Sequence, residues 1–507
     1  MKCVRCTCGL RLTIVIAVII NLVILLYLAH MQHRLATLNT LHSTRENTEL
    51  HVDSYQEMTS DSVTFIFGEY EDFENDIANS TLSILSMFPD KDVVVVSDSL
   101  PYPPLKLPKK HNVHLVTMVI SPEKQLLDSR PENYIKTEYI LLMPDGVRLK
   151  NKGHVEYMMD YLRHQKSNVK MVAWPLAGDV PVCVDLKMNL KQWTLQYSAV
   201  QRLDVCDAVN GDYPLIMRRR DFLTLSSPFS RPLPAALFIQ SSLHRWKVVI
   251  GNKTLFQRTK MLFTDSHNRW KHQTRKQTRL RDTYRRFGVK LVQRAEQPDE
   301  WFGCQRETAR CFGTVVNDMP DYIYQRRWTP PCCLRALRVT ARHVFLTLQT
   351  QGVRYWLEGG SLLGAARSGD IIPWDYDVDI GIYKDDITRS SQLMECQQGG
   401  AVEDSDGFVW EKAREGDFFR VQYSQTNHLH VDIFPFYSRD GTMTKDTWFK
   451  THRQDTEFPE HYLKPLMKIM FVGMNVSAPN HWRDFLELKF GKGVIESRRY
   501  PDASDAQ

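Results

Sequence analysis

The chain has 507 residues, of which 43% are apolar and 24% are charged, and its formal net charge is +6. That length is too great for one ordinary hydrophobic core, so at least two domains are expected. The charge is too small over this length, and no nucleic-acid-binding motif accompanies it, so binding to DNA or RNA is excluded as the main function.

An uncharged, mostly apolar run occupies residues 12–29 near the N-terminus. As a helix it would measure about 27 Å, which is enough to cross a thin bilayer. Lys2, Arg5 and Arg11 precede the run, which predicts a cytosolic tail at residues 1–11 and a lumenal C-terminal part. A cleaved signal peptide is the alternative, but its apolar core would be shorter. We therefore expect a single-pass type II membrane protein.

The rest of the chain is expected to contain a stem linker and two domains. Residues 30–61 are polar and lack an apolar rhythm, which is typical of a linker. Residues 62–298 alternate short β-branched runs with helix-length segments, which predicts a Rossmann-like α/β domain with a mostly parallel sheet. Residues 299–507 are denser in Cys, Trp, Gly and Pro and are expected to form an α+β catalytic domain. The strands expected in the first domain are residues 63–67, 92–97, 113–119, 139–143 and 171–174.

Two features of the first domain suggest function but are weak. Residues 139–146 resemble the strand and turn that carry the metal-binding Asp-x-Asp of many glycosyltransferases, yet only Asp145 is present. One carboxylate holds a divalent cation poorly, so we interpret this domain as non-catalytic. Ten Lys or Arg residues and one acid lie between His267 and Arg294. This basic run suits either a surface for an anionic substrate or a solvated helix face, and the second interpretation is favoured.

Cysteines and glycosylation motifs matter if this part of the chain faces an oxidising lumen. Cys183 and Cys206 enclose a short loop and are predicted to form a disulfide, with two free buried thiols as the alternative. Asn79 and Asn252 begin Asn-x-Thr motifs and are predicted to be glycosylated.

Four more cysteines lie close together at the start of the second domain. Their sulfurs could hold a structural zinc ion in a tetrahedron, or they could form two disulfides. Two prolines before the adjacent pair indicate a rigid turn that presents both sulfurs, which favours zinc. The four residues are Cys304, Cys311, Cys332 and Cys333.

An acidic strand is expected at residues 374–380, where apolar and acidic side chains alternate. Asp375, Asp377 and Asp379 would then share one face, where three carboxylates repel one another unless a cation lies among them. Alternate residues on a strand lie about 6.6 Å apart, so Asp377 and Asp379 are the favoured pair for one ion, with Asp375 assisting. A calcium loop is disfavoured because Ile380 stands where that loop needs glycine, and a solvated acidic edge remains an alternative.

A second strand is expected at residues 428–436, with His428, His430 and Asp432 on one face. Asp432 lies between two apolar residues, and a buried carboxylate is costly unless it meets a cation. We therefore expect the Asp432 carboxylate to point toward the same metal, and the two histidines to contact the residues that bind it. A plain edge strand is the alternative.

A turn and a short helix are expected just before the acidic strand. Gly359 and Gly360 predict the turn, and Ser361 is the predicted N-cap of the helix. Backbone N–H groups at a helix start suit phosphate oxygens, and Arg367 would neutralise their charge. A glycine pair alone more often marks an ordinary turn, so the phosphate-binding interpretation depends on the acidic strand nearby. Together these features predict a metal-dependent site that handles a phosphoanhydride.

The order of these motifs resembles known families. Gly-Gly-Ser, then Asp-Val-Asp, then Val-Asp-Ile resembles the three-part signature of the nucleotidyltransferase superfamily. The longer runs at residues 356–367 and 371–379 resemble the LicD phosphotransfer family. The similarity is greatest to the fukutin-related members of that family and extends over nearly the whole chain. The runs that carry this last similarity are residues 301–304, 327–333 and 427–432.

The resemblance implies a Golgi membrane enzyme that moves ribitol 5-phosphate from CDP-ribitol onto the ribitol phosphate of the O-mannosyl core glycan of α-dystroglycan. It implies metal-assisted in-line transfer that releases CMP. It implies zinc at the four cysteines, a homo-oligomer formed through the first domain, and fukutin and related Golgi enzymes as partners. The implied ligands of Mg, or Mn, are Asp375, Asp377, Asp379 and Asp432. The implied donor site comprises Gly359, Gly360, Ser361, Arg367, Trp374, Asp375, Tyr376, Asp377, Val378, Asp379, Gln454 and Asp455.

A protein of another class would share some of these features. An anchored, non-catalytic adaptor that binds phosphorylated glycans or partner glycosyltransferases would account for the basic run and for the lone Asp145. It would not account for three acids opposite a phosphate-binding turn, so the enzyme is favoured.

Overall fold

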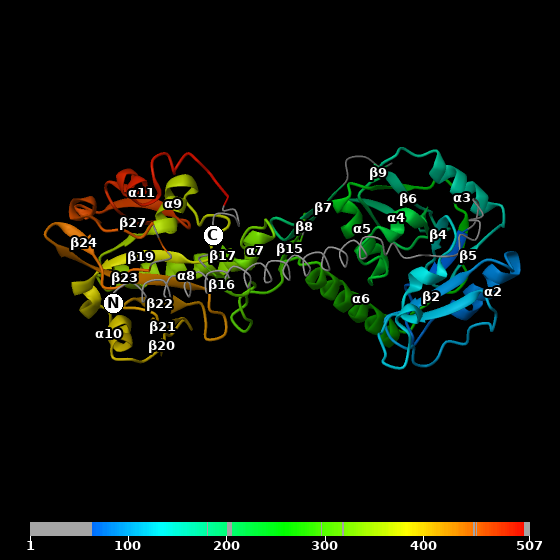
Figure 1. Ribbon diagram of the computed structural model, residues 1–507. Coiled ribbons are helices and arrows are strands. Elements are labelled where there is room, and N and C mark those ends of the chain that lie inside the picture. Colours follow the sequence, from blue (N-terminus) through cyan, green and yellow to red (C-terminus); the bar gives the residue numbers. More distant parts are fainter. Residues whose placement is uncertain are drawn as a thin grey trace, which may run out of the picture. The chain divides into compact units, whose positions relative to one another are not determined.

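The computed structural model describes residues 63–500, except 180, 200–204, 296, 317–318, 450–451 and 453. The segment Ser60–Gln507 forms one compact unit, and Figure 1 labels its elements. The expected tail, membrane anchor and stem linker, residues 1–61, lie outside the described residues.

The predicted localisation, a single-pass type II protein of the Golgi membrane with its catalytic domain in the lumen, is contradicted. No helix in the described part of the chain is both long enough and apolar enough to span a bilayer. The segment on which that prediction depended, residues 12–29, is outside the described part. The Golgi-membrane localisation is therefore not retained.

The N-terminal region, residues 63–301, contains a mixed eight-stranded sheet. In spatial order its strands are β3 (Val113–Thr117), β2 (Val93–Ser97), β1 (Val63–Phe67), β4 (Tyr139–Leu142), β11 (Leu215–Arg218), β6 (Val169–Ala173), β12 (Lys247–Ile250) and β9 (Val205–Cys206). The first four pair in parallel, as the sequence predicted. Strand β11 runs antiparallel between β4 and β6, so the sheet is mixed.

A second sheet in this region was not expected from the sequence. In spatial order its strands are β10 (Ala208–Asn210), β7 (Val182–Asn189), β8 (Thr194–Ala199), β14 (Leu291–Arg294) and β15 (Gln297–Trp301). The expected domain boundary at residue 298 falls inside β15, which pairs with β14. The remaining elements are the pair β5 (Val147–Leu149) and β13 (Phe256–Arg258), and the helices α2 (Ile77–Met87), α3 (His154–Arg163), α4 (Arg219–Leu223), α5 (Leu233–Leu243) and α6 (Ser266–Arg286).

The large sheet is buried on both faces, which explains its β-branched strands. Along β1, Phe65 and Phe67 belong to the hydrophobic cluster on one face, and Ile66 belongs to the cluster on the other. A disulfide joins Cys183 on β7 to Cys206 on β9, in the pairing that the sequence predicted. It therefore links the two sheets of this region.

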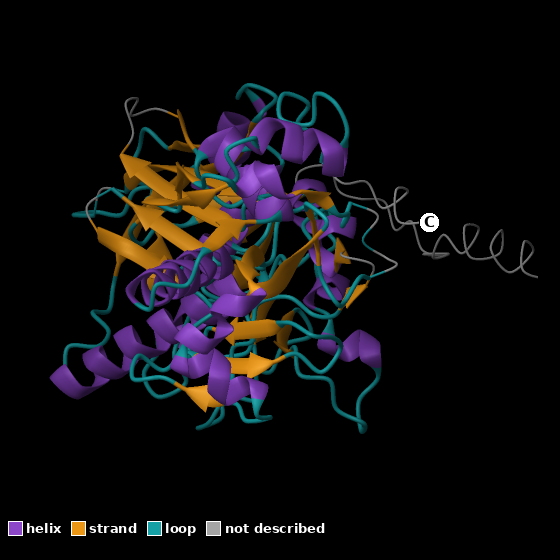
Figure 2. Cartoon of the chain, turned by 90° about the vertical axis from the view of Figure 1, so that its left-hand side faces the viewer, coloured by secondary structure: helices purple, strands orange, loops and turns teal. Residues whose placement is uncertain are grey.

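The C-terminal region, residues 302–500, contains a further mixed sheet, and Figure 2 shows helices (purple) packed around strands (orange). In spatial order its strands are β18 (Tyr355–Leu357), β19 (Val378–Tyr383), β23 (His430–Arg439), β22 (Phe419–Gln422), β21 (Val409–Lys412) and β20 (Val402–Glu403), with β24 (Thr442–Thr444) and β25 (Phe458–Pro459) attached to β23. The remaining elements are the pairs β16 (Val315–Val316) with β17 (Met319–Pro320) and β26 (Met467–Phe471) with β27 (Met474–Ala478), and the helices α7 (Asp321–Tyr324), α8 (Pro331–Thr350), α9 (Gly359–Ser368), α10 (Ser391–Gln397) and α11 (Trp482–Phe490). The region is mixed α and β, as expected.

Strand order in this sheet positions the acidic residues. Strands β19 and β23 are parallel neighbours, and their register places Asp379 opposite Asp432. The indole of Trp356 on β18 lies against Gly381 of β19, where any Cβ would come within 2.3 Å of the ring. Gly381 is therefore required for β18 and its following turn to approach β19 closely.

Candidate functional site

The site lies where α9 begins beside the first residues of β19. The Glu358 N–H donates to the Asp379 carbonyl at 3.0 Å, and the Asp379 N–H donates to the Ser361 hydroxyl at 2.8 Å. Helix α9 begins at Gly359 with Glu358 at its N-cap, so the predicted N-cap role of Ser361 is wrong. The serine hydroxyl instead accepts a hydrogen bond from the strand, which fixes the helix start against β19.

Both glycines of the turn lie against carboxylates. A Cβ at Gly360 would be 2.8 Å from Asp375 Oδ2, which no side chain could avoid without moving the aspartate. At Gly359, whose φ is +47°, a Cβ would be 3.7 Å from Asp379 Oδ2. The N-terminus of α9, with its free N–H groups, therefore faces two acids, and that positive end favours negative charge.

The three predicted aspartates do not all lie on one strand. Strand β19 begins at Val378, so Asp375 and Asp377 belong to the segment before it, and their predicted alternation on a single strand face is wrong. Asp375 is fixed by its backbone: its N–H donates to the Ile372 carbonyl at 2.9 Å. Its carbonyl accepts from the hydroxyl of a buried threonine, Thr329, at 2.5 Å.

Aromatic residues beside these aspartates pack within the C-terminal region. Trp374 packs edge-on against Tyr500, with ring centroids 5.3 Å apart. Tyr376 packs edge-on against Phe312 at 6.2 Å, and Val378 is fully buried. These contacts explain why the apolar residues of the acidic segment alternate with its acids.

Asp432 meets a different cation from the one that the sequence predicted. The guanidinium of Arg420, on β22, donates to both carboxylate oxygens of Asp432, at 2.8 and 3.1 Å. This bidentate pair satisfies the buried carboxylate without a metal. His430 lies farther away, with Nε2 3.8 Å from Asp432 Oδ2, and burial lowers the pKa of its ring. His428 precedes β23 and contacts Gln422 instead.

The pKa of Asp379 is perturbed by its surroundings. Burial, and then the neighbouring carboxylates of Asp432 and Asp375, raise the pKa of Asp379 well above its ordinary value. Lys445 partly offsets this effect. A cation placed beside Asp379 would oppose the shift, because it would stabilise the ionised form.

A buried network of charges behind the site was not predicted. Lys489 of α11 forms an ion pair with Glu358, whose other oxygen accepts from the indole of Trp356 at 2.9 Å. Lys445 pairs with Asp455 at 2.6 Å, and Asp455 lies 3.9 Å from Lys489. Glu358 could have been suspected from its apolar neighbours, but a single lysine on an amphipathic helix carries no such signal.

Two predicted donor-site residues, Asp455 and Arg367, are used structurally. Asp455 belongs to this buried network, and Gln454 precedes it and is half-buried. Arg367 lies in the last turn of α9, where its guanidinium donates to the carbonyls of Val494 and Ser497 at 2.5 and 3.0 Å. The structure therefore does not bring Arg367 to the acidic end of the helix.

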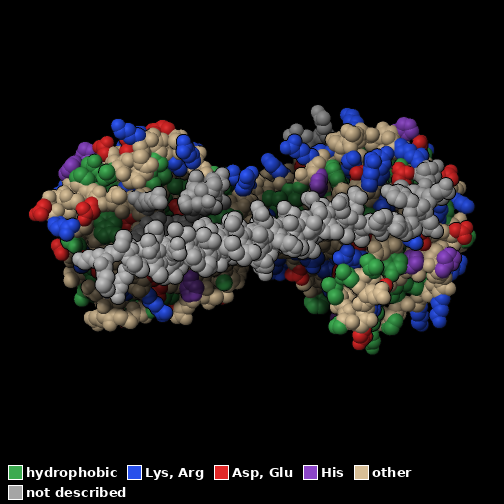
Figure 3. All heavy atoms as spheres, viewed as in Figure 1, with side chains coloured by type: hydrophobic (Ala, Val, Ile, Leu, Met, Phe, Trp, Pro, Cys, Tyr) green, Lys and Arg blue, Asp and Glu red, His purple; other side chains and the backbone are tan. Residues whose placement is uncertain are grey.

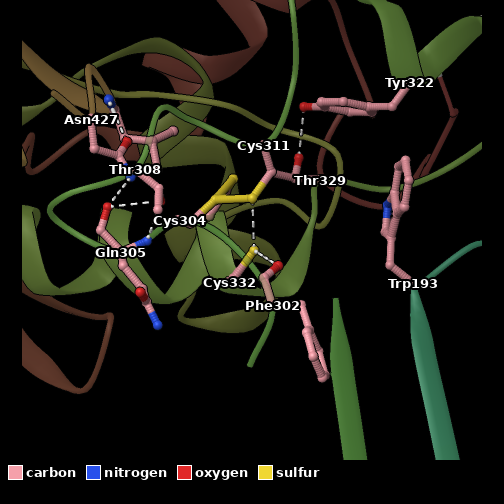
Figure 4. Close-up of a disulfide and its surroundings, with 12 residues drawn as sticks. Trp193, Phe302, Cys304, Gln305, Thr308, Cys311, Tyr322, Thr329, Cys332 and Asn427 are labelled. Atoms are coloured by element: carbon pink, nitrogen blue, oxygen red, sulfur yellow. Dashed lines mark hydrogen bonds between the residues drawn. A yellow bond between two sulfur atoms is a disulfide. The ribbon is translucent and has the colours of Figure 1, made fainter. Parts of the chain in front are cut away.

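The four cysteines converge as expected, and Figure 4 shows the sulfurs of Cys304, Cys311 and Cys332 together. Their sulfur atoms all lie within 4.8 Å of one another, and those of Cys311 and Cys332 are 3.0 Å apart. The Cys304 sulfur contacts both Cys311 and Cys333, although one sulfur can form only one disulfide. Helix α8 begins at Pro331, so the adjacent pair occupies its first turn. This cluster could hold a metal ion.

One other group in the described residues has ligand atoms within the same distance of one another: His343, Asp404 and Asp406. The hydrogen bonds of this group are already made within the protein, because Asp404 accepts from the His343 ring at 2.6 Å and from the Trp410 indole at 2.8 Å. The aspartates around β19 are more widely spaced and do not form such a group among the described residues. A shared ion there would require them to draw closer.

The predicted glycosylation sites are accessible. Asn79, in α2, and Asn252, after β12, are both exposed. Their occupancy stays a prediction.

Comparisons with known proteins agree with the arrangement of the chain. A family model described as "Fukutin-related protein stem domain" matches residues 50–295, and one described as "LicD/FKTN/FKRP, nucleotidyltransferase domain" matches residues 352–481. The chain is 46% identical over 503 residues to the "Ribitol 5-phosphate transferase FKRP" of Mus musculus and to that of Homo sapiens, covering 99% of this chain and 98% of each relative. It is 30% identical over 156 residues to the "Ribitol-5-phosphate transferase FKTN" of Homo sapiens, covering 29% of this chain and 30% of that protein.

Proposed function

The chain belongs to the fukutin-related protein family, and we propose that it transfers ribitol 5-phosphate from CDP-ribitol onto the ribitol phosphate of the O-mannosyl core glycan of α-dystroglycan. The names of the full-length relatives support the transferred group. The observation that carries the proposal is the approach of Asp375 and Asp379 to the N-terminus of α9, beside Asp432. Donor and acceptor follow from the family resemblance.

The acids at this end of α9 fit a hard divalent cation. Asp375, Asp377 and Asp379 offer only oxygen ligands, which Mg²⁺ or Mn²⁺ prefers, and burial beside the carboxylates of Asp432 and Asp375 raises the pKa of Asp379. When bound there, the cation would neutralise charge on the pyrophosphate of the donor. Asp432 is already paired with Arg420, so we assign it a supporting role.

The chain's own residues supply position and charge. The first residues of α9 lie beside the acidic group, where the N–H groups of a helix start can donate to phosphate oxygens. The bond between Ser361 and Asp379 keeps the helix start and the strand in register. The Glu358–Lys489 pair fixes the turn from behind, so these donors need not reorganise during transfer.

A proton must leave the attacking hydroxyl of the acceptor. Asp375 is placed to accept it, because its backbone is fixed by Ile372 and Thr329 while its carboxylate faces the start of α9. The aromatic rings of Trp374 and Tyr376 flank it and form a wall on which the ribitol or cytidine can pack.

We assign zinc to the cysteine cluster. Four sulfurs within 4.8 Å of one another supply the tetrahedral set that structural zinc sites use. Cys304 cannot be bonded to both of its neighbours at once, so a shared metal accounts for the convergence better than two disulfides. The ion would tie residues 302–312 to the start of α8.

A homo-oligomer formed through the N-terminal region, with fukutin and related transferases as partners, is also part of the proposal. Strand β3 is an edge strand of the large sheet, and apolar side chains are exposed around it. Leu100, Tyr102 and Ile120 are 73%, 81% and 74% exposed. Figure 3 shows apolar side chains (green) gathered on this part of the N-terminal region, near the place of β2 in Figure 1. Such exposure is typical of a surface that a partner covers.

The purified protein should release CMP when CDP-ribitol, an acceptor glycopeptide and Mg²⁺ are supplied together. The reaction should stop on addition of EDTA and resume with excess Mg²⁺. Release of pyrophosphate would identify a nucleotidyltransferase that makes the activated donor instead. Binding of the glycopeptide without CMP release would identify the non-catalytic adaptor.

A further inference from the structure

The N-terminal region contains a cavity of about 890 Å³ that the proposed transfer does not use. Its floor is formed where β1 and β4 end, by Gly68, Glu69 and Asp145 among others. A volume of this size is typical of pockets for small ligands.

The cavity lies at a particular place in the sheet topology. Strand β1 has β2 and then β3 on one side, and β4 pairs with it in parallel on the other. The strands that follow β1 in the chain are therefore added first on one side of it and then, from β4 onward, on the other. This reversal makes the β1–β4 junction a topological switch point. Open α/β sheets bind ligands outside the carboxyl ends of their strands at such points. The cavity therefore lies where the topology of an open α/β sheet favours a ligand-binding site.

One face of α6 forms a wall of the cavity. His272, Lys276, Leu280 and Tyr284 all line it, and their spacing of four residues places them on one stripe of the helix. The Tyr284 hydroxyl lies 3.1 Å from that of Tyr197 on β8, so two aromatic side chains meet there. The wall is thus largely aromatic and apolar.

Two cations of α6 are held by an acid that lines the cavity. Arg275 and Arg279 bind Glu71, with contacts of 3.3 and 2.6 Å. The basic run of the sequence is therefore divided between ion pairs and solvent, which agrees with the interpretation favoured from the sequence.

Charged side chains of both signs line the cavity. Five acids line it, Glu69, Glu71, Asp145, Asp179 and Asp212, together with three cations, Arg258, Lys276 and Arg294. Most of the acids have a cation beside them: Arg258 pairs with Asp212 at 2.8 Å and lies 3.5 Å from Asp179, Glu71 is held by two arginines of α6, and Glu69 lies 3.6 Å from Arg231. The charge around the cavity is therefore close to balance and offers a phosphate or nucleoside diphosphate no strongly positive site.

The carboxyl groups at the floor retain capacity to accept hydrogen bonds. Both oxygens of Asp145 accept from the Asp76 N–H, at 2.9 and 3.2 Å, and the Gly146 N–H also donates to this carboxyl group. A carboxylate can accept about four hydrogen bonds, so part of its capacity is unused. Glu69 accepts from the Leu233 N–H at 2.5 Å and keeps its second oxygen. Burial raises the pKa of Asp145 to about 7, since no cation neutralises it fully.

We propose that this cavity binds the neutral ring of a sugar, with hydroxyl groups donating to Asp145 and Glu69 and the ring packing against the aromatic wall of Tyr197 and Tyr284. Carboxyl acceptors combined with aromatic faces match a ligand that has hydroxyl groups on its edges and C–H groups on its faces. The proposal does not depend on the transferase reaction, because its residues and those of the acidic site do not overlap.

The test is ligand-observed NMR on the full chain with methyl glycosides of mannose, galactose and N-acetylglucosamine at millimolar concentration. Uridine diphosphate and inorganic phosphate serve as anionic probes. At least one glycoside should bind. Asp145→Asn should weaken that binding about tenfold, because a charged acceptor is replaced by a neutral one. Ala235→Phe, at a half-buried alanine in the lining, should abolish it by filling the cavity.

Lys276→Met provides the matched control, because it removes a cation from the same cavity and should leave glycoside binding unchanged. Thermal unfolding of each variant shows whether a loss of glycoside binding is due to a loss of folding. If Asp145→Asn does not fold, Ala235→Phe alone tests the proposal. The proposal is overturned if no glycoside binds, or if both cavity variants bind it normally. It is also overturned if only the anionic probes bind and Lys276→Met weakens them.

Discussion

Both regions place an aspartate beside a parallel strand, Asp379 at the start of β19 and Asp145 just after β4, but they surround it differently. Asp379 in the C-terminal region lies among other carboxylates and beside a helix N-terminus. Lysines buried behind it balance part of that charge. Asp145 in the N-terminal region accepts from the Asp76 and Gly146 N–H groups, with Arg148 as a weaker influence.

The difference indicates what each site can hold. Several acids can share a small volume only if cations offset them, and the buried lysines supply part of that charge while leaving room for a divalent ion and a diphosphate. A lone, partly protonated carboxyl is suited to neutral hydroxyl groups instead. We therefore expect an aspartate to serve transfer in one region and recognition in the other.

The largest effect should come from removing charge at the acidic site. Asp379→Asn should lower the rate of CMP release at least about a hundredfold, because it removes a ligand of the divalent ion. Asp145→Asn, the same substitution in the other region, should leave CMP release from CDP-ribitol and a small acceptor unchanged. Equal losses in the two variants would remove the distinction between the regions.

The buried network should be the next most sensitive feature. Lys489→Met leaves Glu358 buried without its cation, which should lower the free energy of unfolding by about 3–5 kcal/mol. Urea titration of the purified protein measures this loss. Adding Glu358→Gln should restore part of it, since the remaining charge is then removed. An unchanged midpoint in Lys489→Met would show that the network does not support the site.

Loss of metal binding by the cysteine cluster should lower the stability less than loss of the buried ion pair does. Cys332→Ser should remove the bound zinc measured by elemental analysis and lower the Tm by about 5 °C or more. Cys396→Ser is the matched control, because Cys396 is also a free, buried cysteine but lies outside the cluster. Full zinc content in Cys332→Ser would favour disulfides.

The smallest effect should be a pH dependence in the N-terminal region. Asp145 has a pKa of about 7 in the folded chain, against an ordinary value of 3.8. The folded state therefore binds more protons than the unfolded state between these values, and its stability falls as the pH rises through that window. Asp145→Asn removes this loss, so its Tm minus that of the unsubstituted chain should increase from pH 4 to pH 7. A constant difference would contradict the raised pKa.

The sequence alone predicted those structural features that depend on residues close together in the chain. Strand β1 was predicted with its observed bounds, because a β-branched run buried on both faces is unambiguous. Cys332 and Cys333 were expected in a rigid turn, and the prolines before them do begin a helix. The acidic segment was also expected to lie opposite the glycine turn, and Gly360 does lie against Asp375.

Contacts between distant residues were not predictable. Arg420 neutralises Asp432 through strand pairing between β22 and β23, which depends on the whole sheet. Lys489 reaches Glu358 across 131 residues, and nothing in its own helix distinguishes it from a solvent-facing lysine. The second sheet of the N-terminal region was missed because its strands β14 and β8 are parallel neighbours far apart in sequence.

The Glu358–Lys489 pair also has a consequence for biosynthesis. Glu358 leaves the ribosome well before Lys489, so the growing chain carries an acid destined for the interior without its counter-charge until α11 is complete. We expect the transfer site to become fully ordered only after α11 has been synthesised. A stop codon before α11 would leave every proposed metal ligand in place but would remove the cation that pairs with Glu358.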